Sequence, residues 1–365
     1  MRPGKTLNRN LRGAAMLEQY LEDLENRLDV AVEEKLEADW REFLSGRCPA
    51  PYFQPRRGEA VPARVEWPKL LINPALKDLE LMLLRELSVA SRCIAEGNGQ
   101  ILNIRCNYGT TILPSLFGVE IFYLDDAHDT LPASHPLPGG TDGIRALVDA
   151  GVPDLDRGWG ARVFETAAYF REKLAPYPKL SEYVRIYHPD LQGPLDLAEM
   201  IWGSDIFLAF YDCPELVKAL LALLTETYRR FMHRWEEAFP GRTGRLCSHW
   251  GWGHIGRIVL RDDSAMNLPA EMYREFAQPF DRELLEEFGG GVVHFCGRGD
   301  HYIADLAATP GLTGVQLSQP EYNDMETIYR NTVDRGIPLL ALSLEGAVKP
   351  ALAAGRNLHG LVHCY

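Results

Sequence analysis

His294 and Cys296 stand two positions apart in an apolar, β-compatible segment, residues 291–296. Residues two apart in a strand point to the same face, so an imidazole and a thiol would lie side by side. A second thiol, Cys364, is in another apolar run, residues 358–364. Nitrogen and sulfur donors of this kind bind zinc, but cysteine is also among the most buried residue types. The pattern alone fits either a metal site or core packing.

A second candidate cluster is the segment 248–254, which holds two histidines, two tryptophans and two glycines. Aromatic rings beside flexible glycines suit the rim of a pocket for a flat ligand, such as an aromatic ether or a corrin face. We therefore expect His249, Trp250 and Trp252 to bind substrate. A buried aromatic corner is the alternative interpretation.

Five further polar residues follow predicted strands. Tyr108 is a candidate proton donor or orienting hydroxyl, and His188 and Glu345 are candidate general acids or bases. Arg105 could pair with a substrate carboxylate in a bidentate manner, with Asn107 beside it. An ordinary loop tyrosine and an internal salt bridge are the structural alternatives for Tyr108 and Arg105.

The elements that would position these residues are short apolar runs alternating with helical segments. The runs are 101–105, 119–123, 183–187, 246–250, 291–296, 314–317, 339–342 and 358–364. The helical segments are 76–95, 215–235, 269–288, 302–307 and 321–335. This alternation predicts an α/β fold with a parallel sheet, and eight runs favour a (β/α)8 TIM-type barrel. In such barrels the chemistry lies in the loops that follow the strands.

The N-terminal part has a different pattern. Apolar residues recur at helical spacing over 14–44, which predicts one long amphipathic helix that could pack on the barrel or on a second subunit in a homodimer. Residues 48–68 are rich in proline, arginine and glycine and are expected to be irregular. We therefore predict an N-terminal helical extension and connection, 1–75, and a barrel, 76–365.

Composition narrows the classes of function. The chain has 365 residues and a net charge of −13, which argues against a nucleic-acid partner. The seven cysteines are odd in number and scattered, so reduced thiols in the cytoplasm are expected rather than a secreted disulfide framework. We find no signal peptide and no apolar run long enough to span a membrane.

Three motifs together resemble the uroporphyrinogen decarboxylase superfamily. Residues 192–198, Gln-Gly-Pro-Leu-Asp-Leu-Ala, resemble its QGP-type turn. Asp262-Asp263-Ser264, the segment 272–276 and Pro279 resemble the stretch before its central strand, and His294-Phe295-Cys296-Gly297 resembles the end of that strand. The likeness runs from about residue 90 onward. From the residues alone, Asp262 and Asp263 fit helix capping better than a pocket.

The resemblance implies one of two chemistries. Uroporphyrinogen decarboxylases act without a metal and grip carboxylates through an N-terminal arginine motif, for which Arg56, Arg57 and Arg105 have the wrong neighbours. The cobalamin-dependent methyltransferases instead hold zinc through His-x-Cys and a distant cysteine.

We therefore expect His294, Cys296 and Cys364 to hold zinc and leave one position open, as catalytic zinc sites do. Glu321 could complete the set, although Gln319 occupies the place where relatives carry a carboxylate. The predicted reaction moves a methyl group between a small O- or S-methyl substrate and a corrinoid (cobalamin), which a partner corrinoid protein could carry.

Two alternatives remain open on the sequence. One is a lyase that acts on a tetrapyrrole carboxylate, with Arg105 binding the substrate. The other is a non-catalytic barrel that binds a corrinoid, a tetrapyrrole or a corrinoid protein, with the helix 14–44 as its docking surface.

Overall fold

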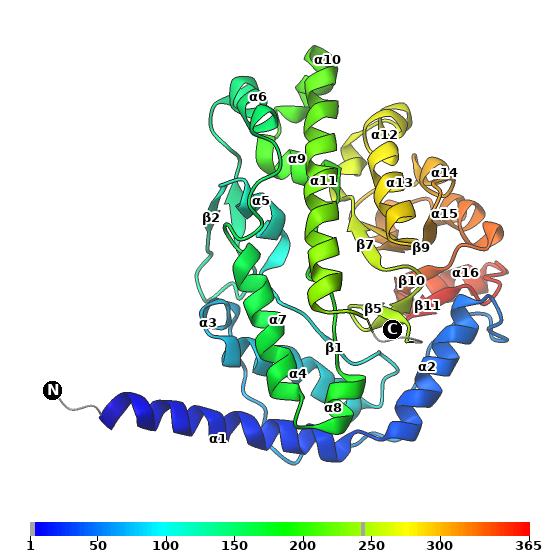
Figure 1. The fold of residues 1–365 in the computed structure, drawn as a ribbon. Helices are drawn as coiled ribbons and strands as arrows, with labels where there is room; N and C mark the ends of the chain where they lie inside the picture. Colours follow the sequence, from blue (N-terminus) through cyan, green and yellow to red (C-terminus); the bar gives the residue numbers. More distant parts are fainter. Residues whose placement is uncertain (1–3, 242–244) are drawn as a thin grey trace.

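The largest sheet is parallel and has five strands in the order β11-β10-β9-β8-β7. Four of them, β7, β9, β10 and β11, are labelled on the right of Figure 1. The strands are β7 (Ile258–Arg261), β8 (Gly291–Phe295), β9 (Leu312–Leu317), β10 (Leu339–Leu342) and β11 (Val362–Cys364). This computed structural model describes residues 4–241 and 245–365, with side chains from residue 16 onward, so the first three residues of the predicted extension lie outside it. The predicted α/β class with a parallel sheet is confirmed.

The other strands form three separate pairs. β1 (Asn103–Ile104) and β4 (Arg185–Ile186) are parallel. β2 (Glu120–Phe122) and β3 (Ala133–His135) form an antiparallel pair, and so do β5 (Cys247–His249) and β6 (Trp252–His254). Two of the eight predicted runs are therefore arms of antiparallel pairs.

The described strands are not joined in one continuous ladder, so the closed eight-stranded barrel that the alternation predicts is not shown. Between β4 and β7 the chain passes beside the sheet without a regular ladder, with one backbone bond from Gly193 N–H to the Arg261 carbonyl, 2.8 Å. Pro189 and Pro194 lie in this stretch, and proline has no N–H to donate to a ladder. A side chain at Gly193 would also come within 2.7 Å of the Arg261 carbonyl, so glycine allows this close approach.

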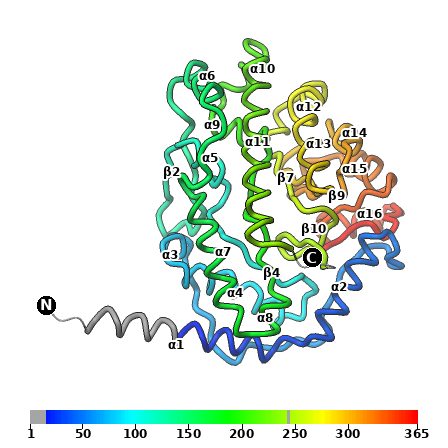
Figure 2. Tube along the Cα trace, viewed as in Figure 1, coloured from blue at the N-terminus to red at the C-terminus, as the bar shows by residue number. Residues whose placement is uncertain are grey.

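The N-terminal segment forms two helices instead of the single predicted one. α1 (Gly4–Arg27) ends before Asp29, and α2 (Val30–Leu44) starts after it at a different angle (Figure 2). The Asp29 carboxylate accepts hydrogen bonds from the backbone N–H groups of Ala31 and Val32. This N-cap stabilises a new helix start and explains the break within an otherwise continuous apolar pattern.

Fourteen further helices follow α2 in the described ranges. They are α3 (Ile72–Lys77), α4 (Leu79–Glu96), α5 (Ile112–Leu116), α6 (Gly140–Ala150), α7 (Gly160–Leu174), α8 (Pro178–Tyr183), α9 (Pro194–Trp202), α10 (Ile206–Asp212), α11 (Pro214–Ala238), α12 (Ala270–Phe276), α13 (Gln278–Glu287), α14 (Ile303–Leu306), α15 (Met325–Asn331) and α16 (Lys349–Ala353). The predicted helix 215–235 is confirmed as α11. The predicted helix 269–288 divides into α12 and α13 next to Pro279, in agreement with the helix-breaking effect of proline. None of the helices within the described ranges is long and apolar enough to cross a membrane.

The two faces of the sheet pack against different partners. Alternate strand residues such as Leu260 and Val293 join the large core. Their neighbours Val259 and Val292 join a smaller cluster with Trp40 of α2. The period-two alternation of strands explains this division. Helix α2 therefore covers the face of the sheet that carries Val259 and Val292. The candidate site is on this same face.

Candidate metal site and its chamber

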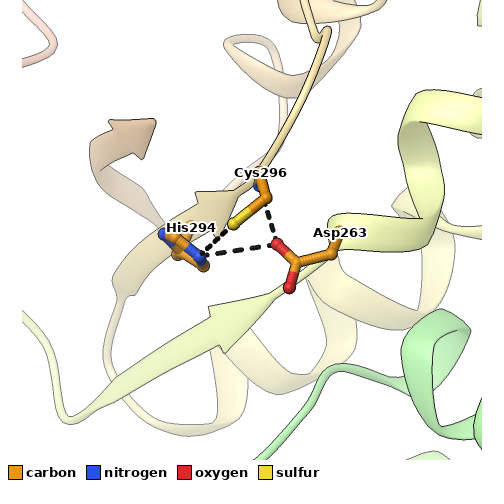
Figure 3. Close-up of side chains that lie close together, drawn as sticks. All are labelled: Asp263, His294 and Cys296. Carbon is orange, nitrogen blue, oxygen red and sulfur yellow. Dashed lines mark hydrogen bonds and ion pairs between the residues drawn. The ribbon is translucent and has the colours of Figure 1, made fainter. Parts of the chain in front are cut away.

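Asp263, His294 and Cys296 bring three potential metal ligands together, all within 4.8 Å of one another (Figure 3). Cys296 Sγ lies 3.5 Å from His294 Nε2, which lies 3.4 Å from Asp263 Oδ1. Across the described ranges this is the one group of three such side chains at that spacing. The structure thus places His294 and Cys296 together and adds a carboxylate to them.

The pairing of β7 with β8 explains why these residues meet. The two strands are parallel, and Arg261 is in register with His294. Asp263 and Cys296 each lie two residues beyond that pair, at the same edge of the sheet, and the Cys296 N–H donates to Asp263 Oδ1 at 2.7 Å. On the other side, the Asp196 carboxylate accepts from the N–H groups of Asp263 and Ser264, at 3.0 and 2.7 Å. These bonds fix the turn that carries Asp263.

The imidazole of His294 is held in one orientation. Its Nδ1 is hydrogen-bonded to the side-chain oxygen of Gln316 on β9, so Nδ1 carries the proton and Nε2 is left with a lone pair. Burial lowers the pKa of His294, which keeps the ring neutral. Burial and the nearby Asp263 raise the pKa of the Cys296 thiol to about 11. A cation between these groups would favour the thiolate form.

The donor chemistry fits zinc. One nitrogen, one sulfur and one carboxylate oxygen are the ligand types that zinc takes, and three protein ligands leave a position for substrate. A second partner that orients the ligating histidine, here Gln316, is a common feature of such sites.

Cys364 and Glu321, which the sequence offered as further ligands, lie apart from this group. β11 is three places from β8 in the sheet, and Cys364 Sγ is 3.8 Å from the Phe53 carbonyl, to which it donates. Cys364 packs in the large core, while the preceding residue, His363, faces the chamber described below. Glu321 is exposed on the 3-10 helix Pro320–Tyr322. The prediction for Cys364 overlooked which face of its strand the thiol occupies.

A cavity of about 410 Å³ is lined by one of the three candidate ligands, His294, and we call it the metal chamber. Its lining residues are Gln100, Trp250, Gly251, Trp252, His294, Gln316, Ser318, Ala341, His363 and Tyr365. The volume is that of a small-molecule site, and the two tryptophans give it flat apolar walls. Trp250 and Trp252 thus stand where the sequence analysis expected substrate-binding residues.

The Asp190 carboxylate is the shared partner of the other polar side chains behind Trp250. It pairs with Arg105, and its Oδ1 lies 2.6 Å from Arg261 Nη2 and 3.3 Å from His249 Nε2. The indole N–H of Trp250 donates to Oδ2 at 3.4 Å. Although burial opposes ionisation, the two guanidinium groups hold the pKa of Asp190 well below its usual range. Arg105 and His249 therefore have an internal partner, and His249 is fully buried behind the chamber wall.

A second cavity of about 460 Å³ lies on the other side of Trp250 and includes Arg105 and Asn107 in its lining. The Asn107 side-chain amide donates to Glu86 of α4 at 2.9 Å. Arg105 and Asn107, two of the five residues predicted to bind substrate, thus lie together. They line the cavity beside the metal chamber and not the chamber itself.

The three predicted acid–base residues lie outside the metal chamber. The Tyr108 hydroxyl is 2.8 Å from Thr166 Oγ1 in the core. His188 Nδ1 donates to the Pro189 carbonyl at 2.8 Å and Nε2 accepts from Val259 N–H, and burial lowers the pKa of His188 to about 4. Glu345 is exposed and pairs with Lys349. Core packing accounts for the position of Tyr108, and backbone partners account for that of His188. Glu345 is a solvent-exposed side chain on the surface.

No sequence pattern assigns a site role to Gln316 or His363, and for Asp263 the residues favour helix capping over a pocket. The available signal for Asp263 was the run Ile258–Leu260, a short apolar strand directly before two aspartates. The predicted set of strands does not include this run, and without it the two aspartates fit a helix cap and not a strand end.

Comparison with known proteins gives a fold but no family. No protein-family model and no curated protein sequence matches the chain. Among solved structures, a methyltransferase from Methanosarcina mazei is similar, with a TM-score of 0.58 and 19% identity. The likeness covers 90% of this chain and 92% of that one. The chain therefore shares the fold of that methyltransferase.

Proposed function

We propose that the protein is a zinc-dependent methyltransferase that moves a methyl group between a small O- or S-methyl substrate and a corrinoid carried by a partner protein. The observation that carries this proposal is the convergence of Asp263 and Cys296 on His294, which lines the metal chamber. The fold shared with a methyltransferase supports it. The motifs that resemble the uroporphyrinogen decarboxylase superfamily, with its eight-stranded barrel, are part of the same proposal.

In this proposal Asp263 takes the place that the sequence gave to Cys364. Zinc, when bound, lowers the pKa of a thiol or alcohol and acts as a Lewis acid toward an ether oxygen. His294 contributes its Nε2 lone pair, Cys296 its thiolate and Asp263 its carboxylate. A substrate in the chamber would lie next to the bound metal, because His294, which would hold the metal, lines the chamber.

The chain's own residues would orient the substrate and exclude water. Trp250 and Trp252 form walls that pack against an apolar or aromatic ligand. The guanidinium of Arg261 lies 4.4 Å from the ring centre of Trp250, and Asp190 holds the indole N–H. The wall is thus fixed before a ligand arrives, which reduces the entropy lost on binding.

The lyase alternative finds less support in the geometry. A tetrapyrrole carboxylate needs unpaired cations, but Arg105 and Arg261 share Asp190. Neither guanidinium is therefore free for a substrate without breaking a buried ion pair.

Methyl transfer between a corrinoid and a small substrate tests the proposal. We expect the zinc-loaded protein to change the corrinoid absorbance with at least one of three substrates: 2-mercaptoethanol with methylcobalamin, or methanol or a methoxylated aromatic with cob(I)alamin. The zinc-stripped protein and Cys296→Ser should be inactive, whereas Cys213→Ser, at the start of α11, should keep the activity. A zinc-loaded protein with no turnover on thiols, methanol or methoxylated aromatics would sink the proposal.

Gln316 is expected to set the zinc affinity without touching the metal. Gln316→Leu removes the acceptor for His294 Nδ1–H and should weaken zinc binding about 10–100-fold, as losses of such partners do. Gln316→Glu keeps an acceptor and should retain the affinity. Competition with a chromophoric chelator measures both variants. Equal affinities for wild type and Gln316→Leu would contradict the orienting role.

A further inference from the structure

The imidazole of His363 lies in the wall of the metal chamber, where the proposed function has given it no role. Only 3% of the residue is exposed. Its ring centre lies 4.5 Å from that of Trp40 and 5.9 Å from that of Phe53. These aromatic neighbours fix the ring in place but offer it no strong hydrogen-bond acceptor.

The protonation of this ring follows from one backbone contact. The N–H of Ala341 donates to His363 Nδ1 at 3.0 Å. A backbone N–H can only donate, so Nδ1 carries no proton and the neutral ring carries it on Nε2. Burial agrees with this form, because it lowers the pKa of His363 to about 3.

The backbone at Ala341 is bent to make this contact. Ala341 has a φ of 55°, in the left-handed region that residues other than glycine rarely adopt. It lies in β10 where the pairing with β11 shifts register, between Leu339 and Leu342. The irregularity takes the Ala341 N–H out of the ladder and directs it to His363. Strained backbone of this kind persists where the surrounding structure holds it, and it is concentrated at ligand sites.

The remaining polar atom, Nε2, makes no hydrogen bond to any described side chain or backbone group, and it is not among the fully enclosed unpaired atoms. His363 lines the chamber together with His294 and Trp252, so its ring borders the cavity. A fixed, neutral N–H donor therefore stands in the same small cavity as the proposed zinc ligand.

We propose that His363 is a substrate-binding residue whose Nε2–H donates a hydrogen bond to an oxygen of the ligand, and that this ligand is an aryl methyl ether. The choice of a methyl ether as substrate rests on the proposed function. The hydrogen bond from His363 does not, because it requires no bound metal. A neutral N–H donor selects an acceptor, and a thioether sulfur is a weak acceptor compared with oxygen. The tryptophan walls suit an aromatic ring. His363 thus separates the O-methyl from the S-methyl class.

Two probes of nearly the same shape test this contact without any metal. Anisole has an ether oxygen where ethylbenzene has a methylene group. We expect calorimetric titration of the zinc-free protein to show about tenfold tighter binding of anisole, the usual size of one neutral hydrogen bond. Thioanisole should bind about as weakly as ethylbenzene.

Two variants of His363 separate the donor from the packing. His363→Asn keeps an acceptor for the Ala341 N–H but has no donor at the Nε2 position, so the preference for anisole should disappear. His363→Gln places an amide N–H near that position and should keep part of the preference. Zinc content and far-UV circular dichroism should match the wild type in both variants.

The outcomes are separable from those of the proposed function. Equal affinities of the wild-type protein for anisole and ethylbenzene would overturn the inference, and this measurement requires no variant. A preference for anisole that remains in His363→Asn would also overturn it. A His363-dependent preference in a protein that binds no zinc would reject the metal mechanism but keep the binding role of His363.

Discussion

The protein supplied with excess zinc is expected to retain about one zinc ion per chain after dialysis, as a three-ligand catalytic site would. His294→Ala and Cys296→Ser should lose it, because each removes one of three donors that lie within 4.8 Å of one another. Asp263→Ala should lose most of it for the same reason. Elemental mass spectrometry of the dialysed proteins gives the stoichiometry directly.

Cys364→Ser is the matched control for this experiment. Its thiol donates to the Phe53 carbonyl in the core, so the variant should keep its zinc. The opposite result, zinc lost from Cys364→Ser and kept by Asp263→Ala, would restore the ligand set of the sequence analysis. It would also require β11 to present its other face to the chamber.

Asp190→Ala should lower the free energy of unfolding by about 3–5 kcal/mol, the usual effect of removing one partner of a buried ion pair. Asp190 is 7% exposed and is the carboxylate partner of both Arg105 and Arg261. Its removal leaves two guanidinium groups in the interior without that counter-charge. Urea denaturation followed by tryptophan fluorescence measures the change.

A surface pair provides the comparison. Asp156 and Arg234 are 2.7 Å apart, but their side chains are 53% and 39% exposed. Asp156→Ala should therefore change stability by less than about 1 kcal/mol. If Asp190→Ala and Asp156→Ala lower the free energy of unfolding equally, water in the neighbouring cavity must solvate Arg105 and Arg261 in the absence of Asp190.

The sequence predicted those parts of the site that depend on strand periodicity. The alternation of a strand places His294 and Cys296 on one face, and the structure has them 3.5 Å apart. In the last strand, β11, the residue that faces the chamber is His363, the neighbour of Cys364. Alternation says that two neighbours point to opposite faces, but not which of them points inward.

Other features depend on contacts that no local pattern records. Asp263 enters the site because β7, only four residues long, pairs in register with β8. The predicted barrel rested on counting apolar runs, but two of those runs, β2 and β5, have antiparallel partners. Asp190 became the partner of Arg105 through a contact across 85 positions of the chain, which composition and spacing do not reveal.

The pairing of Phe53 with β11 has a consequence for biosynthesis. The Cys364 thiol and the Phe53 carbonyl are in contact although 311 positions separate them in the chain. Contacts so distant in sequence form slowly, because a long loop must close first. On a translating ribosome, Trp40 and Phe53 must wait for His363 to emerge before the chamber wall can form. The apolar face of α2 would meanwhile be available to molecular chaperones.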